Sequence, residues 1–187
     1  MTNLTRCPWP SNDPLMITYH DNEWGIPLHD DRKLFEFMVL DCFQAGLSWR
    51  TVLHKRENFR LALDDFDYRK IAEYGQEKID SLLQDSGIIR NKAKINGTIQ
   101  NARSFLLVQK EFGSFDQYIW KFTDGKTILN RWQNLNELPA RSELSDQMSK
   151  DLVKRGFKFV GSTICYAFIQ AIGMVNDHLV TCFRYTG

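Results

Sequence analysis

Two cysteines and two histidines lie near the two ends of this chain, and their spacing limits how the chain can fold. Twelve residues separate Cys7 from His20, and three separate His178 from Cys182. Two thiolates and two imidazoles can form a closed tetrahedral zinc site, which would be structural because no position stays open for water or substrate. One ion bound by all four would hold the two ends of the chain together.

The same residues have simpler interpretations. A free cysteine is usually a small buried apolar residue, and the two halves are too far apart to form a recognised zinc-finger motif. Disulfides are less expected, because the N-terminal residues contain no apolar segment that would direct the chain to an oxidising compartment. We therefore expect a cytoplasmic protein.

Length and composition indicate one globular unit over residues 1–187. The chain has 187 residues, 43% of them hydrophobic, which is enough for a real core. No run of eighteen apolar residues is present, so no membrane contact is expected. The net charge is only +1, so any basic surface for nucleic acid has to be local.

Apolar residues recur with a helical period along almost the whole chain. Asp30-Asp31 and Asp67 are suited to cap helices. Helices are predicted from the cap at Asp30-Asp31 to the break at 44–46, and over about 48–63, 67–71, 79–87, 92–110, 115–122, 145–155 and 163–175. The last is apolar nearly all round and is predicted to be the buried central helix, whereas 123–144 is polar and irregular and predicted to be a flexible connection. No strand pattern competes, so the fold class is predicted to be all-α.

A tight turn joins two of these helices, within an element of about residues 80–110. Gly87 is predicted to end the first helix, and Arg90 and Lys92 lie at the start of the second. A helix-hairpin-helix of this kind presents backbone N–H groups and basic side chains to DNA phosphates without reading sequence. An ordinary helix–helix turn with a glycine C-cap is the more common explanation of such a segment.

Aromatic residues are concentrated in the first fifty positions, together with polar side chains. Aromatic faces beside a carboxylate suit a flat cationic ring, although a single aromatic more often belongs to a plain core. Leu47, at a turn, is a candidate wedge between DNA base steps. The aromatic residues are Trp9, Tyr19, Trp24 and Trp49, and the polar ones are Asp21, Glu23, Asp41, Gln44 and Ser48.

Four motifs make the chain recognisable: YHDNEWG at 19–25, QAGLSW at 44–49, KREN at 55–58 and KRGFKFVG at 154–161. In this order, the sequence from Cys7 to Cys182 resembles the bacterial DNA-3-methyladenine glycosylase I family. The resemblance implies a helix-hairpin-helix glycosylase fold with a cleft. It also implies a monomer that flips 3-methyladenine out of alkylated double-stranded DNA and hydrolyses its N-glycosidic bond, leaving an abasic site.

The resemblance also assigns site residues. It implies that one structural zinc on Cys7, His20, His178 and Cys182 joins the terminal segments in a subdomain. Catalytic roles fall on Asp41 and Tyr19, base binding on Trp49, Trp9, Trp24 and Met16, and DNA binding on Leu47, Gly87, Arg90 and Lys92. Asp41 replaces a glutamate of the family and Met16 a tyrosine of one branch, and both changes are candidates for altering lesion preference.

Two other functional classes stay open at this point. A non-catalytic protein that binds alkylation damage is compatible with the changes at Asp41 and Met16. A zinc hydrolase is disfavoured, because two thiolates and two imidazoles leave no open coordination site.

Overall fold

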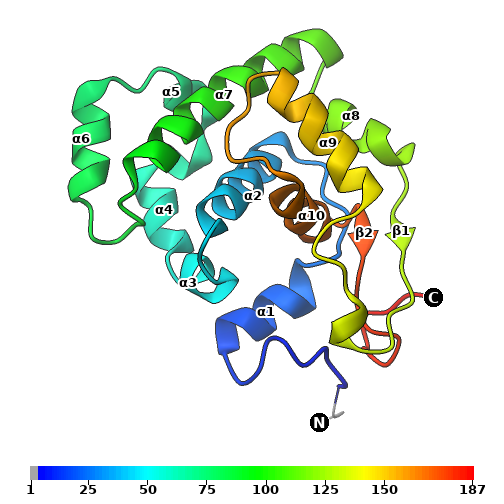
Figure 1. Ribbon diagram of the computed structural model, residues 1–187. Helices are drawn as coiled ribbons and strands as arrows, with labels where there is room; N and C mark the ends of the chain where they lie inside the picture. Colours follow the sequence, from blue (N-terminus) through cyan, green and yellow to red (C-terminus); the bar gives the residue numbers. More distant parts are fainter. Residues whose placement is uncertain (1–3) are drawn as a thin grey trace.

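The computed structural model describes residues 4–187, and this part of the chain is mostly helical. Two helices lie at the centre, α2 (Asp31–Gln44) and α10 (Ser162–Ala171), and the others surround them (Figure 1). The surrounding helices are α1 (Pro14–Asn22), α3 (Trp49–Leu53), α4 (Arg56–Ala62), α5 (Tyr68–Ala72), α6 (Gln76–Gln84), α7 (Lys92–Phe112), α8 (Phe115–Ile119) and α9 (Glu143–Lys154).

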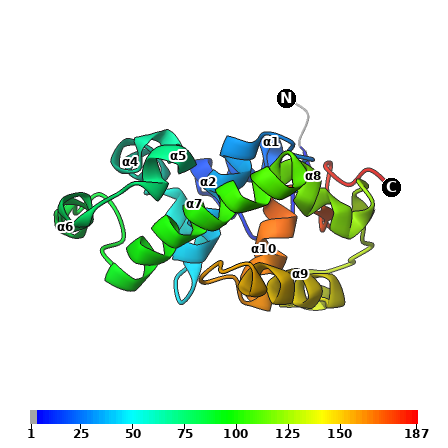
Figure 2. The ribbon, with the colours of Figure 1, turned by 90° about the horizontal axis from the view of Figure 1, so that it is seen from above.

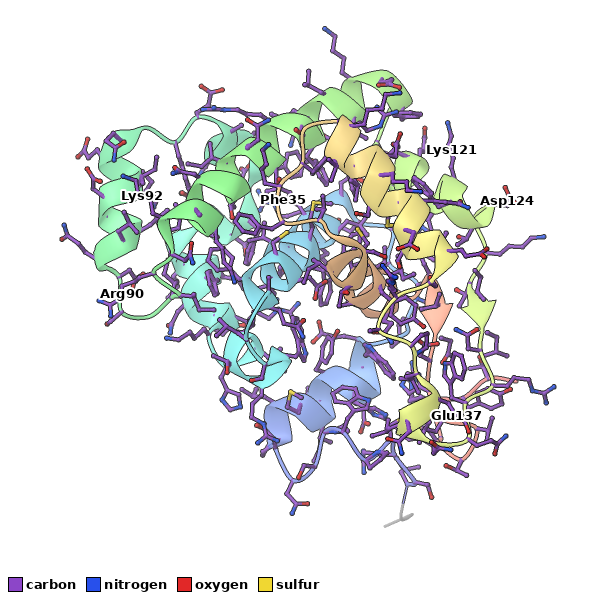
Figure 3. All side chains as sticks on the ribbon, in the orientation of Figure 1. Phe35, Arg90, Lys92, Lys121, Asp124 and Glu137 are labelled. Carbon is purple, nitrogen blue, oxygen red and sulfur yellow. The ribbon has the colours of Figure 1, made fainter. Side chains whose placement is uncertain are left out.

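Helix α2 is the most deeply buried element. Every residue from 34 to 43 is buried, including Phe35, which Figure 3 labels at the centre of the molecule. The central position was predicted for 163–175 alone. In the structure α10 shares it with α2, and α10 ends at Ala171, before a short strand. A sequence that is apolar all round thus identified one of the two central helices. Helix α2 was predicted, between the cap at Asp30-Asp31 and the break at 44–46, but not as a central helix.

The predicted helix caps at two aspartates are confirmed. Asp30 Oδ1 accepts the Lys33 N–H at 2.9 Å at the start of α2. Asp67 Oδ1 accepts the Arg69 N–H at 3.0 Å at the start of α5. In each case the side chain satisfies one of the N–H groups that a helix start leaves without an intrahelical partner.

Two helix predictions were wrong in their boundaries, and one helix was missed. The single helix predicted over 48–63 is two helices, α3 and α4, with a break at His54 and Lys55. The helix predicted over 115–122 is α8 followed by a 3-10 turn over Trp120–Thr123. Helix α1 was not predicted, although Asp13 as N-cap and Pro14 in the first turn are typical of a helix start.

The prediction of no strands was also wrong, in a small way. The two-residue strands β1 (Ile128–Leu129) and β2 (Val175–Asn176) pair in parallel. Strands this short show no alternation in the sequence. They tie the segment predicted as a flexible connection to the C-terminal residues, as does the hydrogen bond from Val180 N–H to the Trp132 carbonyl at 3.0 Å. That segment also contains a 3-10 turn, η3 (Leu135–Glu137).

The two ends of the described chain lie side by side. The N–H of Phe183 donates to the carbonyl of Thr5 at 2.8 Å. Helix α6 lies at the opposite end of the molecule from the C-terminus (Figure 2). Within residues 4–187, no helix has the length and apolar character needed to cross a membrane.

Candidate functional site

A pocket of about 270 Å³ opens between α1, α2, α10 and the η3 segment. Its walls combine aromatic rings with a small number of polar groups, as is typical of ligand sites. The lining residues are Trp9, Tyr19, Trp24, Asp41, Gln44, Trp49, Leu135, Leu138, Ala167 and Gln170. The structure therefore brings together five of the six residues predicted for catalysis and base binding.

The sixth, Met16, lies on α1 one turn before Tyr19 and is buried, but it is not among the lining residues. Sequence reasoning also missed five lining residues: Gln44, Leu135, Leu138, Ala167 and Gln170. Gln44 was noted only as a polar neighbour of the aromatic cluster. The spacing of Ala167 and Gln170 on one face of α10 was a signal that they lie together, but not that this face borders a pocket.

The aromatic residues form two contacting pairs. The ring centroids of Tyr19 and Trp49 lie 4.9 Å apart with an interplanar angle of 47°, and those of Trp9 and Trp24 lie 5.1 Å apart at 74°. A flat ring between two parallel faces needs roughly 7 Å, since carbon atoms contact at about 3.5 Å. Tyr19 and Trp49 thus form one wall, and a base in the pocket would lie against that wall and not between the two rings.

Asp41 is the buried carboxylate of the pocket, with only 2% of its surface exposed. Its Oδ2 atom accepts no hydrogen bond within the described part of the chain. Burial raises the pKa of this carboxyl well above its usual range. The indole Nε1 atoms of Trp9 and Trp49 are likewise buried without a partner among residues 4–187. Unsatisfied buried groups are uncommon in folded proteins, and three around one pocket indicate a place for a polar, flat ligand.

Tyr19 keeps its proton in this environment. Burial raises the pKa of the phenol well above its usual value, and the charges of Asp41 and Glu23 raise it further. A neutral phenol both donates and accepts hydrogen bonds. Tyr19 is therefore available as a hydrogen-bonding group as well as an aromatic surface.

Leu47 lies outside the pocket, in the turn after α2. Its side chain is 43% exposed, and its N–H donates to the carbonyl of the pocket residue Gln44 at 2.7 Å. Gly46, immediately before it, has a φ of +78°, a conformation that favours glycine. The predicted wedge is therefore an exposed apolar side chain close to the pocket.

The predicted hairpin consists of α6, the turn at 85–91 and α7. Arg90 and Lys92 are exposed, on the opposite side of the molecule from Glu137 of the η3 segment in the view of Figure 3. The expected role of Gly87 in ending α6 was wrong, because α6 ends at Gln84. The Gly87 N–H donates to Asp85 Oδ1 at 2.7 Å, and a Cβ atom at this position would lie 2.9 Å from the same oxygen.

Other basic residues near the turn hold it in place. Lys55 Nζ donates to the carbonyls of Ser86 and Gly87 at 3.1 and 3.0 Å. Lys94 is buried, and its Nζ donates to the carbonyls of Phe43 and Ala45 at the end of α2, at 2.8 and 2.6 Å. These two lysines are already engaged, whereas Arg90 and Lys92, at the turn and the start of α7, are exposed.

Three of the four predicted metal ligands form a buried cluster. The ligand atoms of Cys7, His20 and Cys182 all lie within 4.8 Å of one another, and Cys182 Sγ is 3.5 Å from His20 Nε2. The fourth, His178, lies beside them, with its ring centroid 4.8 Å from that of His20. A Cβ atom at Gly25 would lie 3.0 Å from the His178 ring, so the close approach requires glycine there.

The hydrogen bonds of both imidazoles suit metal binding. His20 Nδ1 is 2.7 Å from Asp21 Oδ1, and His178 Nδ1 is 3.0 Å from Asn176 Oδ1. Such oxygen partners hold Nδ1 protonated and leave Nε2 free to bind a metal. His178 Nε2 is buried and has no partner among the described residues. Burial lowers the pKa of His178 to about 4, so its ring is neutral, as a ligand must be. The four side chains therefore fit a metal ion.

Tyr19 also lines a larger cleft of about 450 Å³. Two of its charged groups pair with each other, because Arg56 Nη1 lies 2.7 Å from Glu23 Oε2. The aromatic pocket, with three buried polar atoms that have no partner among residues 4–187, is the better candidate for ligand binding.

Comparison with known proteins agrees with this geometry. A family model described as methyladenine glycosylase matches residues 9–185. The chain is 49% identical over 184 residues to DNA-3-methyladenine glycosylase 1 of Escherichia coli (strain K12), covering 98% of both chains. It is 47% identical over 178 residues to DNA-3-methyladenine glycosylase of Haemophilus influenzae (strain ATCC 51907 / DSM 11121 / KW20 / Rd), covering 95% of this chain and 96% of that one.

Solved structures show the same similarity. A crystal structure of 3-methyladenine DNA glycosylase I matches with a TM-score of 0.94 and 50% identity, covering 97% of this chain and 100% of that chain. The 3-methyladenine DNA glycosylase I of Staphylococcus aureus, described for its recognition of 3-methyladenine, matches with a TM-score of 0.94 and 31% identity over 98% of both chains.

Proposed function

The chain belongs to the methyladenine glycosylase family, and we propose that it excises 3-methyladenine from alkylated duplex DNA. The enzyme flips the damaged nucleotide into its aromatic pocket and hydrolyses the N-glycosidic bond, leaving an abasic site. The observation that carries this proposal is the buried Asp41 oxygen that has no partner among residues 4–187, in a pocket lined by tryptophan and tyrosine.

The chemistry of the lesion matches this pocket. Methylation at N3 makes the adenine of the nucleotide cationic and already a good leaving group, so no strong general acid is needed. The protein has to hold a flat cation against aromatic faces and place negative charge near it. Burial raises the pKa of the Asp41 carboxyl and so disfavours its charged form, and a cationic base in the pocket favours that charged form, which supplies the negative charge.

On the DNA side, the proposal gives separate roles to two surfaces. Leu47 fills the space left in the base stack, and Arg90 and Lys92 contact the phosphate backbone without reading sequence. The N–H of Gly87 is occupied by Asp85, so Gly87 serves the hairpin by permitting the tight turn. The protein acts as a monomer.

A zinc ion on Cys7, His20, His178 and Cys182 is part of the same proposal. The chemistry of the donor set and the free Nε2 of His178 support it. A site filled by four protein ligands supplies folding stability and takes no part in the reaction.

The test is the release of free bases from methylated duplex DNA, separated by chromatography, with the wild-type protein and Asp41→Asn. The wild type should release 3-methyladenine, and the variant should release it more slowly while its binding to undamaged duplex stays the same. A wild-type protein that binds methylated DNA and releases no base would be a damage-binding protein. Release of a different methylated base would show a changed lesion preference, for which Asp41 is the first candidate cause.

A further inference from the structure

Asp177 is a buried carboxylate, 1% exposed, that accepts four hydrogen bonds. Its Oδ1 accepts from Asn130 Nδ2 at 2.6 Å and from Trp132 Nε1 at 2.8 Å. Its Oδ2 accepts from the hydroxyl of Tyr166 and from Gln170 Nε2, both at 2.7 Å. One of these four donors, Gln170, also lines the aromatic pocket.

This arrangement determines which end of the Gln170 amide is free. Both oxygens of Asp177 accept hydrogen bonds, and the Gln170 amide is assigned with its NH₂ group facing Asp177. The amide oxygen, Oε1, receives no hydrogen bond from any of residues 4–187 in the structure. The main chain at this position is fixed as well, because the Gln170 carbonyl accepts the Gly25 N–H at 2.9 Å. Gln170 therefore brings to the pocket an amide oxygen that is free to accept a hydrogen bond, and its NH₂ group keeps one N–H beyond the one given to Asp177.

We propose that Gln170 determines specificity by accepting a hydrogen bond from the exocyclic amine of the flipped purine, and that Asp177 positions its amide for this contact. The inference rests on the proposed function and adds that the pocket recognises the amine at C6 of the base. Adenine carries an amine donor at C6, whereas hypoxanthine and guanine carry an oxygen acceptor there. Gln170 Oε1 is an acceptor, so an oxo base would leave it facing another acceptor.

The experiment compares the binding of two free bases, 3-methyladenine and 3-methylhypoxanthine, by calorimetry. They have similar shapes and differ at C6 in having a donor or an acceptor. The wild type should prefer the amine by roughly 10- to 100-fold, because leaving a buried acceptor unsatisfied is costly. Gln170→Met keeps the length of the side chain and removes the acceptor, and it should reduce this preference at least about fivefold. Gln170→Asn, which withdraws the amide by one methylene, should reduce it as well.

Tyr166→Phe is the matched control. It removes another donor to the same Asp177 oxygen, from the same helix, at a residue that does not line the pocket. It should lower thermal stability about as much as Gln170→Met and keep the preference for the amine. A purely structural role for the Gln170–Asp177 hydrogen bond predicts equal effects of the two variants on the preference.

The outcomes separate the two proposals. A wild type that prefers neither base, a Gln170→Met variant with unchanged preference, or a Tyr166→Phe variant that loses it would each overturn the assignment to Gln170. If wild-type protein still releases 3-methyladenine from methylated DNA in those cases, the proposed function stands without this inference. If it neither releases nor binds that base, both fail.

Discussion

Replacing Asp41 by asparagine should stabilise the protein at neutral pH while it lowers excision of 3-methyladenine. Asp41 is 2% exposed, its Oδ2 has no partner in the described chain, and burial is the cause of its raised pKa. A buried carboxylate without a counter-charge costs free energy of folding. Asparagine has nearly the same shape and cannot ionise, so the variant removes this cost together with the charge that favours a cationic base.

The pH dependence of the effect follows from the direction of the pKa shift. The pKa of Asp41 is higher in the folded chain than in the unfolded chain, where it is about 3.9. The folded protein therefore binds the proton more tightly, and the free energy of unfolding falls as the pH rises above about 4. The loss is at most about 1.4 kcal/mol per pH unit and stops once the pH passes the folded-state pKa. Below about pH 4 wild type and Asp41→Asn should be equally stable.

At pH 7 the difference in free energy of unfolding is the loss accumulated between about pH 4 and pH 7, which is at most about 4 kcal/mol, and we expect about 1–3 kcal/mol. For a chain of this length, that corresponds to a rise of roughly 2–12 °C in Tm. Thermal unfolding of both proteins from pH 4 to pH 8 measures it, with Asp41→Glu as a control that keeps an ionisable group. A Tm difference that is zero or negative at pH 7, or that is the same at every pH, would refute the account of Asp41 as an unpaired buried carboxyl.

Three further predictions concern the metal, the DNA surface and the length of the pocket carboxylate. Protein purified without chelator should contain one zinc per chain, and metal analysis without zinc would contradict this. Cys182→Ala should lower Tm, whereas the excision rate of the protein that remains folded should change little. Changing Arg90 and Lys92 together to alanine should weaken binding to all duplex sequences alike. It should also reduce the slope of log K against log salt concentration by the amount expected for about two phosphate contacts; an unchanged slope would show that the hairpin is a structural turn without a role in DNA binding. Asp41→Glu should retain or raise excision in the base-release assay, and a loss of activity would show that the pocket is adapted to the shorter side chain.

Local features of the fold were predictable because they depend on neighbouring residues. The caps at Asp30 and Asp67 and the long helix α7 follow from side chains within a few positions of each other. The strands β1 and β2 were not predictable, since each has only two residues and forms because residues 128–129 and 175–176 meet in the fold. The break between α3 and α4 was missed because the apolar period continues across it.

For the pocket, too, some residues were predictable from the sequence and others were not. The aromatic residues and Asp41 were identified from their density and from the family motifs. Leu135 and Leu138 reach the pocket from a segment with no sequence signal of its own, and Gln170 from a helix that was predicted without any sign that one of its faces borders a pocket. The role of Gln170 depends on Asp177, and a hydrogen bond between two side chains of this kind becomes visible only when α10 and the C-terminal segment are in place.

The pocket and the cysteine–histidine cluster share two stretches of backbone. Tyr19 lines the pocket and its neighbour His20 belongs to the cluster; Asp177 holds a pocket residue and its neighbour His178 lies beside the cluster. Successive residues of a helix point in different directions, so α1 can serve both sites at once. A metal ion at the cluster would therefore fix the backbone on which two walls of the pocket depend. The metal ion would not contact the N-glycosidic bond. Loss of the metal should therefore lower the amount of folded protein first, and affect the chemistry at Asp41 only through that loss.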